Sequence, residues 1–226
     1  MNTSPSSPRT DGAGVPSLSL RERKKQRTRR LLADTALTLF AERGFDRVTL
    51  EELTAHAEIG RSTFFRYYAT KEDVALAAEG DLWDAYLDHF SRHTSGGLAL
   101  DALRTTLTAA ILAMPGDWDQ RFLATRRLAA GTPVLRDHSI LSSMKTQTRL
   151  VELLEERLDV DSREDVRLRL LGEIALAAWR CGARNWVAGR GYNNRRGHGG
   201  KRSLARRVDE AFDAIPAGLM LDLPDG

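Results

Sequence analysis

The stretch GRSTFFRYYATKED, residues 60–73, decides the fold together with FAERGFDRVTLEELTAHAEI, residues 40–59, which precedes it. Thr49 is expected to begin a short helix, because Glu52 follows three residues later as a capping box requires. A break at residues 58–60 separates this helix from a second one, which we expect over residues 61–68. Two short helices joined by a tight turn form a helix-turn-helix.

The second helix of this pair divides into a buried and an exposed side. Phe64 and Tyr68 are four residues apart, so both turn toward a small core. This spacing alone also fits an ordinary pair of surface helices. The outward side is polar and aromatic, with Arg61, Thr63, Phe65 and Tyr67.

Outside this motif the chain is helical nearly throughout, because Ala, Leu, Arg and Glu dominate and no segment alternates with period two. A first helix over residues 21–43 should end at Gly44 with a positive φ. Its core face is Leu32, Ala36, Leu39 and Phe40. Further helices are expected over residues 70–90, 98–113, 118–130, 133–158, 163–189 and 203–215. The chain is therefore all-α with about nine helices: a disordered tail (1–20), a helix-turn-helix domain (21–72) and a helical body (73–226).

The charge of the chain is unevenly distributed. The 226 residues carry a net +3, but residues 21–71 alone carry +5 and residues 72–226 carry −2. A basic block beside a slightly acidic body favours a head that binds a polyanion.

Several function classes are excluded by composition and motifs. A single cysteine, Cys181, rules out an intramolecular disulfide, and its place on an apolar stripe predicts an inert core thiol. His89 and His93 are four residues apart but lack a third ligand, so we expect neither metal nor cofactor. Phosphate-binding and nucleophile motifs are missing, so we expect no enzyme. No apolar run reaches membrane length and no signal peptide is present, so we expect no membrane partner and a cytoplasmic location.

The quoted stretch closely resembles the N-terminal domain of the TetR family of bacterial transcriptional regulators, over about residues 25–75. The resemblance implies phosphate contacts from Thr49 and Lys71. It implies base or backbone contacts from Arg61, Ser62, Thr63 and Tyr67. Arg61 suits guanine, since a guanidinium donates to both O6 and N7; a plain phosphate clamp remains open.

Two positions depart from the family pattern. Phe65 replaces the usual tyrosine, so it can pack on sugar or a thymine methyl but cannot bond phosphate. Glu58 stands where glycine is common and is expected to have φ > 0. The basic block at residues 21–30 includes Lys24 and Arg27. It reads equally well as a DNA-contacting arm or as a solvated helix end.

The resemblance also implies a ligand-binding and dimerisation domain. We expect a homodimer through the last two helices, 163–189 and 203–215; burial within one subunit is the alternative. The candidate effector-binding residues are mainly aromatic, although each also suits a plain core: Trp83, Tyr86, Met114, Trp118, Phe122, Arg126, Met144, Trp179 and Arg180. The FFRYY stretch and residues 118–127 are similar to a subgroup related to mycofactocin regulators, which implies an acyl-CoA-like effector.

The sequence thus predicts a DNA-binding transcriptional regulator, in its leading form a repressor released from a palindromic operator by a small molecule. An inducer-independent nucleoid or division-site DNA-binding protein of the same fold is the second hypothesis, and an enzyme on a helical scaffold is the third.

Overall fold

The computed structural model describes residues 19–189 and 199–223, and the regular secondary structure in this part of the chain is all helical. The head consists of α1 (Leu20–Arg43), α2 (Leu50–His56) and α3 (Arg61–Phe65). The body contains α4 (Lys71–Ala75), α5 (Ala77–Arg92), α6 (Ala99–Ala113), α7 (Trp118–Gly131), α8 (Pro133–Leu158), α9 (Val166–Val187), α10 (Lys201–Asp213) and α11 (Ile215–Gly218). The all-α prediction is confirmed.

The helix boundaries differ from the expected ones in three places. The helix expected over residues 70–90 is interrupted at Leu76, whose φ of −100° and ψ of 17° leave the helical region. The short α11 was not expected, and together with the split at Leu76 it brings the described helices to eleven instead of about nine. The recognition helix α3 ends at Phe65 and does not reach residue 68.

The predicted tail, residues 1–20, lies almost wholly outside the described residues. The predicted disordered tail extends two residues too far, because Ser19 already caps α1. The Ser19 hydroxyl accepts a hydrogen bond from the backbone N–H of Glu22 at 3.2 Å, and Leu20 is the first helical residue.

The local signals around the helix-turn-helix are confirmed. Thr49 and Glu52 form a reciprocal capping box on α2, and Thr70 with Asp73 forms another on α4. Gly44 has a φ of 84°, so the chain turns sharply after α1. Glu58, between α2 and α3, has a φ of 53°. A side chain rarely adopts this left-handed conformation, so the turn holds Glu58 under some strain.

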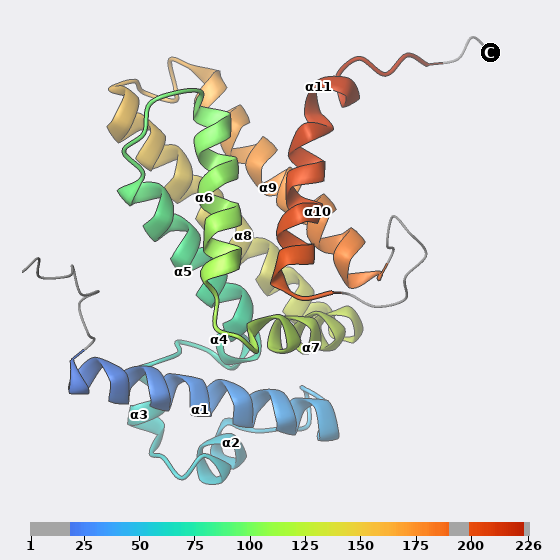
Figure 1. Cartoon of the computed structure of the whole chain (residues 1–226). Helices are drawn as coiled ribbons and strands as arrows, with labels where there is room; N and C mark the ends of the chain where they lie inside the picture. The colour runs from blue at the N-terminus through green and yellow to red at the C-terminus, as the bar shows by residue number, and fades with distance from the viewer. Residues whose placement is uncertain (1–18, 190–198, 224–226) are drawn as a thin grey trace, which may run out of the picture.

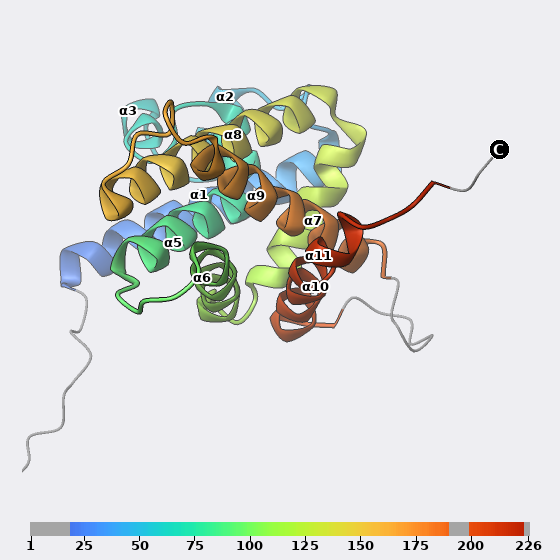
Figure 2. The same cartoon turned by 90° about the horizontal axis from the view of Figure 1, so that it is seen from above.

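The described residues contain two apolar cores, one mainly in the head and one in the body, which lies against the head (Figure 1). The head core includes the predicted face of α1 and continues through α4 to Ala77, and it also takes in Ala129 of α7 and Leu135 of α8. The body core begins at Ala78. Seen from above, α9 lies between α8 and α10 (Figure 2). The head is thus packed directly on α4 and α7, and α8 joins the same core through Leu135.

Candidate DNA-binding surface and effector site

The recognition helix presents the side chains that the sequence analysis predicted. Phe64 is fully buried, whereas Arg61 and Ser62 are exposed and Thr63 is half-buried. Phe65 is 50 % exposed, and its ring meets that of Phe64 edge to face at 5.4 Å. An aromatic ring half in solvent next to a polar helix start is available for packing against a nucleotide.

Arg61 has a partner within the head. Its Nη1 lies 2.9 Å from Oε1 of Glu51, in the first turn of α2, and both side chains are more than half exposed. Glu51 was not among the predicted functional residues. The ion pair joins two helices across the turn between α2 and α3, so the periodicity of a single helix does not predict it.

The end of α3 carries a second cation. The guanidinium of Arg66 lies 5.9 Å from the centroid of the Tyr67 ring and donates weakly to the Thr63 hydroxyl at 3.4 Å. Tyr67 is half-buried, so its ring is less open to a phosphate than Arg61 is.

The Thr49 hydroxyl is already engaged. It donates to Oε2 of Glu52 at 3.1 Å and accepts from the Glu52 N–H at 3.2 Å. The Thr49 backbone N–H and then the Arg43 guanidinium, 2.6 Å from Oε1, lower the pKa of Glu52 to about 2. A phosphate at Thr49 therefore has to compete with an ionised Glu52.

Lys71 holds the chain between α1 and α2. Its Nζ donates to the carbonyls of Phe45 at 2.9 Å and of Val48 at 3.0 Å, and lies 4.1 Å from the Phe45 ring centroid. An ammonium has three N–H donors, so one is left for a phosphate. The structure thus gives Lys71 a structural role beside the predicted DNA contact.

The base of the arm is tied to the body. The Tyr68 hydroxyl donates to the Arg29 carbonyl at 3.0 Å, and burial raises the pKa of Tyr68 to about 12. The Arg29 guanidinium pairs with Asp81 at 3.1 Å and with Asp84 at 3.5 Å. Lys24 and Arg27, which precede Arg29 on α1, are exposed, so both can reach a polyanion.

Six of the predicted effector-binding residues lie together in the body core: Trp83, Tyr86, Met114, Trp118, Phe122 and Trp179. The Trp83 and Trp179 rings meet at 5.4 Å, and the Phe122 ring stacks on Trp118 at 4.9 Å. Trp118 donates its indole N–H to the Ala78 carbonyl at 2.7 Å. In the described part of the chain, the buried indole N–H of Trp83 has no acceptor.

The other three predicted effector residues lie outside this cluster. Met144 is 59 % exposed on α8, and Arg180 is exposed on α9. Arg126 is bound to Glu79 at 3.0 Å and to the Ser139 hydroxyl at 3.0 Å. The Cys181 side chain is exposed, so the expectation of a core thiol is wrong. The exposure of Met144, Arg180 and Cys181 has one reason, since the rotation of a helix about its axis decides which of its faces is buried.

Two polar links between elements were missed by sequence reasoning. Glu79, 4 % exposed, accepts from Ser139 at 2.8 Å as well as from Arg126, so the buried carboxylate joins α5, α7 and α8. Nε2 of His138 on α8 lies 2.7 Å from Oδ1 of Asp73, whose other oxygen accepts from the Thr70 N–H. These partners are separated by 47 to 65 residues, so no local pattern could have paired them.

Comparison with known proteins identifies the family to which this helix-turn-helix belongs. Residues 32–78 match the tetR family of bacterial regulatory proteins. The HTH-type transcriptional regulator TcmR of Streptomyces glaucescens is 31 % identical over 173 residues, covering 74 % of this chain and 76 % of TcmR. The chain belongs to the TetR family. It is accordingly a DNA-binding transcriptional regulator.

Other comparisons agree with the TetR assignment. A protein of Mycobacterium tuberculosis named for mycofactocin biosynthesis regulation, MftR, is 26 % identical over 87 % of this chain and 93 % of its own length. The crystal structure of a TetR-family regulator from Syntrophomonas wolfei has a TM-score of 0.55 at 16 % identity, covering 88 % of this chain and all of the other, and shows the shared fold.

Two further findings concern membranes and metals. Among the described residues, none of the helices is both long and apolar enough to cross a membrane. Within residues 19–189 and 199–223, no three His, Cys, Asp or Glu side chains gather as a metal site would require, so His89 and His93 gain no third ligand there.

Proposed function

We propose that this TetR-family chain is a transcriptional repressor that binds a palindromic operator as a homodimer and is released by a small-molecule effector. The observation that carries the proposal is the direct packing of the helix-turn-helix head on α4 and α7 of the body, in a core that α8 also joins through Leu135. A shift of α4 or α7 is proposed to move the head, and with it the recognition helix, relative to the operator. As a DNA-binding regulator it is proposed to act in the cytoplasm, without catalysis of its own.

DNA readout is assigned to the exposed start of α3 and its surroundings. Arg61, Ser62 and Thr63 are proposed to enter the major groove, with Phe65 packing beside them. The sequence-independent contacts are proposed to come from five residues around this helix: Lys24, Arg27, Thr49, Tyr67 and Lys71. Such contacts position the head, whereas the base edges read by α3 give specificity.

We propose that the dimer interface is formed by α8 and α9, and not by α9 and α10 as the sequence suggested. The apolar side of α10 is buried within its own chain, since Leu204 and Val208 are fully buried. It packs closely on α9, because a Cβ on Gly182 of α9 would lie 2.7 Å from the Val208 Cα. On α8 and α9, in contrast, large apolar side chains are exposed: Ile140, Leu141, Met144, Val166 and Leu170. Exposed large apolar side chains on two neighbouring helices are typical of an interface.

The effector is proposed to enter the aromatic cluster of the body. The unpaired indole N–H of Trp83 supports this placement, because a buried donor without an acceptor costs free energy that a ligand oxygen would recover. Long-chain acyl-CoA molecules are the first candidates, following the similarity to MftR. Arg126 is already neutralised by Glu79, so an acyl-CoA phosphate would need another cation.

A footprint on the DNA that flanks the gene, repeated with long-chain acyl-CoAs and other candidate effectors, tests the proposal. We expect one or a few protected palindromes and loss of protection with the effector. Binding at many dispersed genomic sites that no small molecule releases would instead support an inducer-independent DNA-binding protein.

A further inference from the structure

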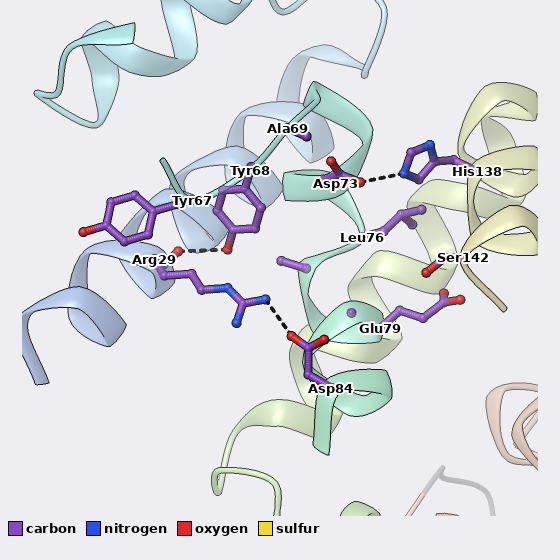
Figure 3. A pocket seen from close by; sticks show the side chains of 12 residues that line it. Arg29, Tyr67, Tyr68, Ala69, Asp73, Leu76, Glu79, Asp84, His138 and Ser142 are labelled. Carbon is purple, nitrogen blue, oxygen red and sulfur yellow. Dashed lines mark hydrogen bonds and ion pairs between the residues drawn. The ribbon is translucent and has the colours of Figure 1, made fainter. Parts of the chain in front are cut away.

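A cavity of about 210 Å³ lies where the head meets the body, apart from the aromatic cluster (Figure 3). Its wall combines α1, the segment between α3 and α4, both halves of the α4–α5 pair and α8. Twelve residues line it, among them Arg29, Tyr67, Asp73, Gly80, Asp84 and His138. An occupant would therefore touch the DNA-binding head and the body at once.

The space in the cavity exists because small residues form part of its wall. Ala69, Ala77 and Gly80 contribute almost no side chain. A Cβ built on Gly80 would meet no atom within 4 Å. Its volume is below that of a drug-sized pocket, and an apolar cavity of about 150 Å³ already holds benzene in another protein. The space thus fits a molecule of about one ring with a short substituent.

The wall is richer in acceptors than in free donors. Of the three carboxylates that line it, Asp73 is paired with His138 and Glu79 with Arg126, and Asp84 faces the guanidinium of Arg29. Arg29 is shared between Asp84 and Asp81, and the Asp84 side chain is 72 % exposed. A carboxylate has about four acceptor sites, so Asp84 keeps acceptors for a further cation.

Aromatic groups complete this environment. Figure 3 shows the Tyr68 ring beside the Arg29 side chain, whose guanidinium points to Asp84. Arg29 already lies 5.8 Å from the Tyr68 ring centroid, as a cation over a ring does. In the described part of the chain no hydrogen bond engages the hydroxyl of Ser142, which leaves one adaptable group on the wall.

We propose that this cavity is a second binding site, one that takes a small organic cation carrying a single ring. The ammonium or amidinium group would sit by Asp84, and the ring would fill the space beside Gly80. The site is distinct from the body cluster proposed for the effector, and its existence does not depend on the repressor function.

The test is isothermal titration of the full chain with three probes of equal size: benzylamine, benzyl alcohol and benzoate. We expect saturable 1:1 binding of benzylamine, weaker binding of the alcohol and none of benzoate. Gly80→Leu fills the cavity and should weaken benzylamine binding by at least about tenfold, the change that a loss of 1.4 kcal/mol produces. Gly80→Ala, which leaves most of the volume, should bind nearly as the natural chain does.

The charge requirement is tested with Asp84→Asn, which should also weaken benzylamine. The matched control is Asp88→Asn, one turn further along α5, where Asp88 pairs with Arg92 at 2.7 Å outside the cavity. Absence of benzylamine binding, equal binding to Gly80→Leu, or equal binding of benzoate would overturn the proposal. DNA binding by each variant is measured in parallel, so that failure of the repressor function is seen separately from failure of this site.

Discussion

The side chain of Arg61, at the start of the recognition helix, is held by Glu51 of the preceding helix at 2.9 Å. Glu51 thus competes with DNA for the guanidinium that is proposed to read a base. Such an exposed pair is worth about 0–1 kcal/mol, enough to tune an affinity without blocking it.

Glu51→Gln should therefore raise operator affinity by up to about fivefold, the factor that 1 kcal/mol carries. Fluorescence anisotropy on operator and on scrambled DNA measures the effect. The control is the same change in an Arg61→Ala background. If Glu51→Gln strengthens binding equally there, the carboxylate acts by general repulsion of phosphates and not through Arg61.

Lys71→Met should destabilise the head. The change removes two hydrogen bonds from an ammonium to the Phe45 and Val48 carbonyls, and bonds of charged groups contribute about 1.5–3 kcal/mol each. Urea unfolding should show a loss of about 2–4 kcal/mol, given that one carbonyl can regain water. Unchanged stability together with weaker DNA binding would show that Lys71 serves phosphate alone.

The sequence predicted the head well because its signals are local. Thr49 with Glu52 and Thr70 with Asp73 cap helices over three residues, and Phe64 with Tyr68 defines a buried face over four. Each pattern lies within about one turn of a helix, where the backbone geometry alone determines which residues contact each other.

The body was harder because its contacts depend on how helices rotate and which helices meet. Met144 belongs to an apolar residue type, yet the rotation of α8 leaves it exposed. Arg126 looked available for an anion, yet α5 brings Glu79 to it. The cavity beside Gly80 needs three separate segments to close it, and no pattern in the sequence contains that information.

Replacing Lys24, Lys25 and Arg27 by alanine should weaken binding to all DNA sequences alike. All three side chains are exposed, and removal of one phosphate-binding cation reduces the slope of log K against log salt by about 0.9. Titrations at several salt concentrations give this slope. Unchanged affinity at low salt would show that the block is a solvated helix end.

The capping carboxylate of Glu52 should titrate far below an ordinary glutamate. Its pKa is lowered from 4.5 to about 2 by the Thr49 N–H and by Arg43. A carboxyl with a depressed folded pKa stabilises the fold above its unfolded pKa, and this stabilisation is lost as the pH falls from about 4.5 toward 2. Glu52→Gln should therefore reduce stability at pH 7 and show a shallower loss on acidification. An NMR midpoint of the Glu52 carboxyl near 4.5 would contradict this.

Two glycine-to-alanine changes in helices should have opposite effects. A Cβ at Gly182 would lie 2.7 Å from the Val208 Cα and 2.8 Å from the Arg207 carbonyl, so α9 and α10 would have to move apart. Overpacking of this kind lowers the free energy of unfolding by about 1–3 kcal/mol. The higher helix propensity of alanine offsets about 1 kcal/mol of this loss. At Gly80 a Cβ meets nothing within 4 Å, so Gly80→Ala should gain about 0.5–1 kcal/mol. Thermal unfolding of the two variants compares them directly, and a gain at Gly182 would mean that α10 does not pack tightly on α9.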